Sequence, residues 1–170
     1  MKNLQITIIL GLLILFGVSA SAQDIVQIHD PIKLSGPRFG FTYIGGDLGK
    51  TLDQYDMSRY RSQFGWQFET RWFETSTGFQ GLVETVVLLT GFETDDPNLS
   101  ASLLFGFRTK KGFEAGAGPN ITSTGDHALV IAVGHTVKLD YVNIPFNFAI
   151  SPSSDAVKYT VLMGFNIRRH

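Results

Sequence analysis

The residue types that most often perform catalysis are scattered along this chain. A hydrolytic site needs a nucleophile, a base and a group that orients the base. Only His127, beside Asp126 and close to Ser123, imitates that arrangement. The segment Ser123-Thr124-Gly125-Asp126 also has the composition of a turn, which explains these residues without any reaction. The four histidines all fall at predicted strand ends or near chain termini: His29, His127, His135 and His170. We therefore predict that the protein is not an enzyme.

Two further motifs resemble ligand sites, and both lack a required part. Gly49-Lys50-Thr51 follows a predicted strand, as a phosphate-binding loop does, but that motif needs a glycine where this chain has Ile44. The acidic residues Glu93, Asp95 and Asp96 could hold a cation loosely, yet their segment has the composition of a solvated loop. We expect no cofactor and no metal site.

The elements that must position any site follow from a two-residue period. The even positions from Phe64 to Trp72 are mainly aromatic, whereas the odd positions from Gln63 to Arg71 are polar or glycine. Successive side chains of a strand point to opposite faces, so this pattern predicts strands. A short helical turn is expected around Leu48 to Tyr55. Strands are expected over about 38–46, 62–74, 79–92, 99–108, 113–122, 127–139, 142–150 and 157–168.

The composition of the two strand faces indicates where the protein resides. One face is aromatic and aliphatic, and the other is mostly Gly, Ala, Ser, Thr and Asn. A soluble barrel would carry Lys and Glu outside, whereas a barrel in lipid is inverted. Charged residues make up 17% of the chain, against about 25% in soluble domains. Tight and longer connections alternate, which is typical of membrane barrels. The predicted fold is all-β: a single antiparallel up-and-down β-barrel of eight strands.

The interior of this barrel is predicted to be polar. The segment 79–92 is apolar on both faces, and Glu84 decides its orientation because a carboxylate facing lipid near the midplane would cost up to a few kcal/mol. The even positions should therefore face inward. The predicted polar cluster of the lumen comprises Gln67, Glu69, Arg71, Glu84, Arg108 and Glu114. Opposite charges can pair in so narrow a space. The cluster is interpreted as a structural plug, with a selective pore lining as the alternative.

Aromatic residues are expected at the two membrane interfaces. Trp66 and Trp72 share the apolar side of one strand, toward its opposite ends, as an aromatic girdle requires. Core packing in a soluble protein is the competing explanation. The predicted girdle comprises Phe39, Trp66, Trp72, Phe107 and Tyr159.

The chain divides into three predicted parts. Lys2, an apolar run from Ile6 to Val18 and the small residues Ala20-Ser21-Ala22 predict a cleaved signal peptide at 1–22. Residues 23–37 form an N-terminal extension, and 38–170 form the barrel. The net charge of −1 gives no reason to expect nucleic-acid binding. No cysteine is present, so no disulfide stabilises the fold.

Three segments carry a resemblance to known proteins: Gly36-Pro37-Arg38-Phe39-Gly40, Ser62-Gln63-Phe64-Gly65-Trp66-Gln67-Phe68-Glu69 and Gly116-Ala117-Gly118-Pro119-Asn120. With them the chain resembles the small eight-stranded outer-membrane β-barrel proteins of Gram-negative bacteria, and more narrowly an exported family of Bacteroidetes-type bacteria. The resemblance covers most of the mature chain and implies an architecture without an assigned activity. It implies the lipid bilayer of the outer membrane and the barrel-insertion machinery as partners. Pro119 and Pro145 each remove a ladder donor, so bulges or a partly open seam are expected there.

Three functional hypotheses follow. The first is an outer-membrane barrel with a structural or surface-interaction role and a narrow, plugged lumen. The second is a soluble periplasmic calycin-like barrel that turns its apolar face inward and binds an apolar ligand. The third is a narrow channel.

Overall fold

The structure is a computed structural model in which residues 32–139 and 142–169 are described. The predicted signal peptide at 1–22 lies outside these residues. The short helix α2 spans Gly46–Gln54, close to the predicted helical turn. The strands are β1 Ile32–Gly45, β2 Tyr60–Glu74, β3 Gln80–Thr90, β4 Asn98–Arg108, β5 Phe113–Thr122, β6 His127–Lys138, β7 Asn143–Pro152, β8 Ala156–Gly164 and β9 Ile167–Arg169.

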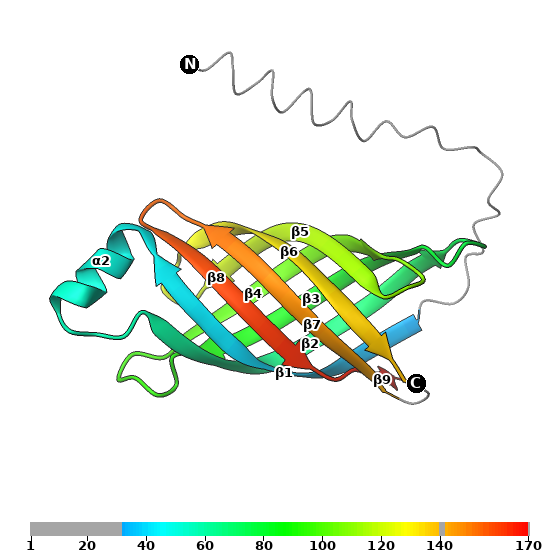
Figure 1. Ribbon diagram of the computed structural model, residues 1–170, viewed down its shortest axis with the longest axis horizontal. Helices are drawn as coiled ribbons and strands as arrows, with labels where there is room; N and C mark the ends of the chain where they lie inside the picture. Colours follow the sequence, from blue (N-terminus) through cyan, green and yellow to red (C-terminus); the bar gives the residue numbers. More distant parts are fainter. Residues whose placement is uncertain (1–31, 140–141, 170) are drawn as a thin grey trace, which may run out of the picture.

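The strands form one closed sheet (Figure 1). Strands that follow each other in the sequence pair antiparallel from β1 to β8, and β1 also pairs with β8. Closure leaves no free edge along the wall of the barrel, so the backbone groups of every long strand have neighbours on both sides. The predicted closed, up-and-down barrel of eight strands is confirmed.

The last strand differs from the prediction, because two prolines interrupt its ladder. The segment expected as one strand at 157–168 is divided into β8 and β9. Continuing the observed registers places Pro37 of β1 opposite Phe165, and Pro145 of β7 opposite Gly164. Proline has no N–H to donate, so both flanking strands lose a donor at nearly the same level. The pairing then resumes in the same register between Asn143 and Asn166.

No bulge is found at the prolines, but the ladders beside them are interrupted, between β4 and β5 at Pro119 and between β7 and β8 at Pro145. The ladder of β5 keeps one register on both sides of Pro119, and the ladders of β7 do so around Pro145. The register shift that the structure shows lies instead in β2, between Arg71 and Phe73. The missing donors therefore interrupt the ladders locally without changing their register.

The first strand begins earlier than predicted. Residues 32–37, expected in the N-terminal extension, belong to β1, where Ile32 pairs with Arg71 of β2. The pair Gly36-Pro37 resembles a break in the sequence. The long β2 nevertheless supplies partners for this stretch, and Leu34 points inward with 4% of its surface exposed.

Three hairpins share one turn geometry. In each, the N–H of a threonine donates to the carbonyl four residues later, and the intervening glycine donates back to the threonine: Thr75–Phe79, Thr109–Phe113 and Thr122–Asp126. The glycines have φ values of +82°, +94° and +87°, in the left-handed region. Such a glycine is the usual feature of a three-residue hairpin loop. The longer connections lie at one end of the barrel, opposite the end where β1 and β3 begin (Figure 1). They are α2 with residues 55–59, and the segment 91–97.

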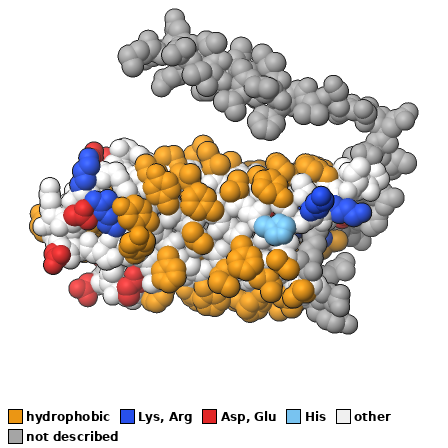
Figure 2. All heavy atoms as spheres, viewed as in Figure 1, with side chains coloured by type: hydrophobic (Ala, Val, Ile, Leu, Met, Phe, Trp, Pro, Cys, Tyr) orange, Lys and Arg blue, Asp and Glu red, His pale blue; other side chains and the backbone are white. Residues whose placement is uncertain are grey.

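The barrel is apolar outside, and its interior buries the charged side chains of the strands. Large hydrophobic side chains stand exposed on the wall, among them Phe41, Phe105 and Val161, while Arg38 and Arg108 are completely buried. Figure 2 shows the hydrophobic side chains spread over the middle of the visible face and charged side chains at its two ends. The soluble alternative requires the apolar face inside, and the structure shows the reverse. Among the described residues, no helix is long and apolar enough to cross a membrane.

Candidate functional site: the barrel lumen

The centre of the lumen is a pair of carboxylates held by one arginine. Arg108, on β4, donates from Nη1 and Nη2 to the two carboxylate oxygens of Glu69 on β2, at 2.6 and 2.8 Å. Its Nε donates to Oε2 of Glu114 on β5 at 2.7 Å. All three side chains are buried. Two-point pairing of guanidinium with carboxylate is the strongest arrangement that such groups make.

Neutral side chains complete the partners of both carboxylates. Thr136 of β6 donates to Glu114 at 3.1 Å, and Asn147 of β7 donates to Oε1 of Glu114 at 2.9 Å. Asn166, between β8 and β9, donates to Oε2 of Glu69 at 3.3 Å. Buried charge is tolerated where its hydrogen bonds are satisfied in this way.

A second arginine, Arg38 of β1, was not among the predicted lumen residues. Its Nε donates to Gln67 at 2.8 Å, and its Nη2 donates to Asn166 at 2.7 Å. Its Nη1 donates to the carbonyl of Pro37 at 2.9 Å, beside the proline-interrupted ladder. The alternation of β1 places Arg38 on the inward face with Gly40 and Thr42, and this was the signal available in the sequence. Together these contacts define the lumen network, to which β1, β2, β4, β5, β6, β7 and the segment between β8 and β9 contribute.

Two of the predicted cluster residues stand at the margin of this network. Nε of Arg71 lies 3.4 Å from Oε1 of Glu69, and the side chain of Arg71 is partly exposed. Glu84 of β3 points inward, as its strand's pattern indicates, and Leu82 and Val86 beside it are buried. Its Oε1 is buried and has no hydrogen-bond partner among the described residues. The structure therefore brings Gln67, Glu69, Arg108 and Glu114 into the lumen network, and leaves one Glu84 oxygen unpaired.

The predicted girdle residues all lie on the wall, at different levels. Phe39, Trp66, Trp72 and Tyr159 are exposed by 40% to 59%. Trp72 and Phe107 lie near the strand ends joined by tight turns, and Tyr159 lies toward the end of the longer connections. Phe39 and Trp66 stand near the middle of their strands. Aromatic rings also meet at both levels: Phe79 stacks on Phe107 with ring centroids 5.2 Å apart, and Tyr43 packs against Tyr60 in a tilted arrangement with centroids 5.2 Å apart.

The residues that could suggest other chemistry have structural partners. Ser123 accepts a hydrogen bond from the Leu99 backbone, and Asp126 accepts one from Thr124 within the turn. Lys50, from the motif resembling a phosphate loop, lies in α2 and pairs with Asp47 at 2.7 Å, which lowers the pKa of Asp47. Glu93 accepts a hydrogen bond from the Ser62 backbone at 2.9 Å, which lowers its pKa.

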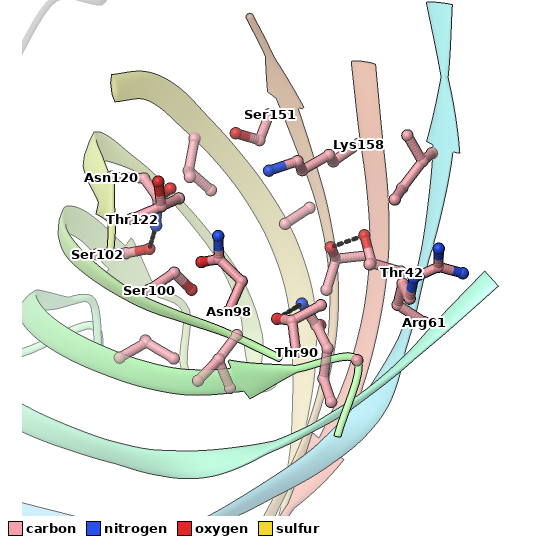
Figure 3. A pocket seen from close by; sticks show the side chains of 18 of the residues that line it. Thr42, Arg61, Thr90, Asn98, Ser100, Ser102, Asn120, Thr122, Ser151 and Lys158 are labelled. Carbon is pink, nitrogen blue, oxygen red and sulfur yellow. Dashed lines mark hydrogen bonds between the residues drawn. The ribbon is translucent and has the colours of Figure 1, made fainter. Parts of the chain in front are cut away.

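Beyond the lumen network lies a cavity of about 570 Å³ that extends to the longer connections. Its floor includes Gln67, Glu84 and Asn147, which are members or neighbours of the network. Its upper wall carries hydroxyl and amide groups from several strands, and Figure 3 shows Ser100, Ser102 and Asn120 on one side facing Lys158 and Thr42 on the other. Hydrogen bonds join neighbouring wall residues, such as Asn120 to Ser102 at 2.9 Å.

The closed barrel, its apolar wall and its buried ion pairs define an eight-stranded, up-and-down β-barrel of inverted polarity. Among solved structures, the crystal structure of Ail, the attachment invasion locus protein of Yersinia pestis, is similar, with a TM-score of 0.53 and 16% identity over 82% of this chain and 97% of that chain. The backbone structure of the outer-membrane protein Ail from the same organism, in a phospholipid bilayer nanodisc, is also similar. Its TM-score is 0.50 and its identity is 16%, over 80% of this chain and 99% of that chain. At this identity the likeness is one of fold. No protein-family model and no curated protein sequence matches the chain.

Proposed function

We propose that this protein is an outer-membrane β-barrel of a Gram-negative bacterium, with its lumen plugged and a structural or surface-interaction role. The observation that carries the proposal is the inverted barrel: exposed apolar side chains on a closed wall, around buried charges that pair with one another. In water, so large an exposed apolar surface would drive association. In lipid it is matched, and closure supplies the backbone hydrogen bonds that lipid cannot.

The lumen network supports the plug. Its members come from strands all around the barrel, and Arg108 joins carboxylates that lie 39 residues and 6 residues away in the sequence. A path for ions would have to separate these pairs, which is costly in a low-dielectric interior. The network therefore favours a closed lumen over the narrow channel.

The surface role is assigned to the end with the longer connections. Short turns are typical of the periplasmic side of outer-membrane barrels and longer loops of the external side. At this end α2 is held to the barrel by Arg59, which pairs with Asp53 and donates to the Tyr43 hydroxyl at 3.1 Å. An ordered helix offers a partner a defined surface. The signal peptide, insertion by the barrel-insertion machinery and a Bacteroidetes-type origin belong to the same proposal.

Fractionation and conductance test these two parts separately. We expect the protein in the outer-membrane fraction of its host, with a gel mobility that changes on heating, and we expect silence in planar bilayers. Recovery as a soluble periplasmic protein would overturn the membrane assignment. Discrete single-channel currents from the wild type would overturn the plug and favour the channel. An Arg38→Ala/Arg108→Ala double variant should conduct if it folds, whereas Lys111→Ala, in an exposed turn, should stay silent.

A further inference from the structure

The cavity above the lumen network has a layered lining. Along β3, the inward positions pass from Glu84 at the floor through Val86 and Leu88 to Thr90 near the mouth. The middle layer is continued around the barrel by a packed apolar cluster: Val86, Leu88, Leu104, Val130 and Leu162. The lining therefore has a polar floor, an apolar middle and a polar mouth, an order that suits a ligand with a polar head and a slender apolar chain.

Acceptors without partners are concentrated in this cavity. Among the described residues, four buried side-chain atoms have no hydrogen-bond partner, and three of them belong to cavity-lining residues: Gln63 Oε1, Glu84 Oε1 and Asn147 Oδ1. The orientation of the Asn147 amide is fixed because its nitrogen donates to the carboxylate of Glu114, which can only accept. Buried acceptors without partners are costly, so a donor placed among them is favoured. Gln63, with 8% of its surface exposed, is nearly enclosed.

The charges that line the cavity are mainly negative. Two cations, Arg61 and Lys158, line it, both from the strand ends near the mouth. Four acidic side chains of its lining come from the loops near the mouth, Glu93, Asp95, Asp96 and Asp126, and the floor adds the buried carboxyl group of Glu84. Arg38 and Arg108 beneath the floor are already engaged by other oxygens, so Glu84 Oε1 is left for a ligand. This balance disfavours anions and attracts cations.

We propose that the cavity is a binding site for a small amphiphilic organic cation, with a primary ammonium head and an unbranched apolar chain. The ammonium enters first and donates to Glu84 Oε1 and Asn147 Oδ1, the unpaired acceptors of the floor. The chain lies against Leu88, Leu104 and Val130. The site depends only on the interior of the folded barrel, so it is independent of where the barrel resides and of whether the lumen conducts.

Calorimetric titration of the folded protein in nanodiscs tests the site, with hexylammonium, hexanol and hexanoate as probes and empty nanodiscs as the blank for lipid partitioning. We expect saturable binding of hexylammonium with one site per barrel, binding of hexanol at least roughly tenfold weaker, and no binding of hexanoate. This comparison needs no variant. Equal binding of hexanol and hexylammonium, or no saturable hexylammonium signal above the blank, would overturn the proposal.

Two variants locate the site within the barrel. Glu84→Gln keeps the shape of the side chain but cannot ionise to pair with a bound ammonium, so hexylammonium binding should weaken at least roughly tenfold. Glu74→Gln, at the opposite end of β2 and outside the cavity lining, is the matched control and should bind as the wild type does. The heat-dependent gel shift shows that each variant is folded. If Glu84→Gln fails that check, Ser102→Phe fills the upper cavity without touching the floor and should abolish binding. Unchanged binding in a folded Glu84→Gln or Ser102→Phe barrel would refute the site.

Discussion

Replacing Arg108 with methionine should destabilise the barrel more than any other single change in the lumen. Methionine keeps an unbranched apolar stem but ends short of the guanidinium position, and it donates nothing to Glu69 and Glu114, which Arg108 contacts at 2.6 to 2.8 Å. Both carboxylates then remain buried without their cation. Breaking a buried ion pair from one side costs about 3–5 kcal/mol. Arg108→Met should therefore lower the free energy of unfolding by about that amount.

Urea unfolding in lipid vesicles, followed by the fluorescence of the two wall tryptophans, measures this loss. Lys111→Met, an exposed position in the adjacent turn, should change stability by less than about 0.5 kcal/mol. A triple variant that also carries Glu69→Gln and Glu114→Gln should recover most of the loss, because neither side chain is then a buried carboxylate that has lost the cation it pairs with. A decrease in the free energy of unfolding of less than about 1 kcal/mol in Arg108→Met, or a triple variant as unstable as the single one, would contradict this prediction.

Three further outcomes are expected. Leu103→Arg places a cation on the wall in the middle of β4. If that wall faces lipid, the variant should lower the free energy of unfolding in vesicles by about 2–4 kcal/mol. An unchanged urea midpoint would contradict this orientation of the wall. Gly118→Ala should reduce the yield of folded barrel, measured by its heat-dependent gel shift, far more than Gly116→Ala does. A Cβ at position 118 would lie 1.9 Å from the Leu103 carbonyl oxygen, whereas one at position 116 would lie 3.2 Å from the Phe105 carbonyl oxygen. Equal yields would contradict this close approach. The pKa of Glu93 is lowered because its carboxylate accepts a hydrogen bond from the Ser62 backbone. This hydrogen bond therefore stabilises the folded loop at neutral pH, and that stabilisation is lost as pH falls through the pKa of the folded state. Amide exchange at Ser62, corrected for the intrinsic pH dependence, should then accelerate in acid and be pH-independent in Glu93→Gln.

The strands were predictable because their pattern is local. The alternation from Gln63 to Trp72 identifies β2, and the tight turns are marked by a threonine three residues before a glycine. Glu84 alone oriented β3, whose two faces are both apolar, because only one orientation avoids a charge in lipid. The ends of strands were less predictable. The first strand was expected to begin only at residue 38, yet β1 begins at Ile32 because β2 offers partners for the earlier residues.

The polar interior was predictable in content and only partly in its contacts. The sequence placed Glu69, Arg108 and Glu114 on the inward faces of their strands. It did not indicate that Asn166 reaches Glu69 across 97 residues, or that Arg38 binds Asn166. The pairing inside a barrel depends on the stagger between its first and last strands, and that stagger is fixed only when the sheet closes.

The sequence by itself thus determined a closed, inverted barrel, because which face of a strand is apolar is a property of alternate residues. The tertiary structure decided which charges meet, which oxygen of Glu84 is left without a partner, and how much of the lumen remains as a cavity. These depend on distances between side chains that are remote in the chain, and only the closed barrel sets those distances.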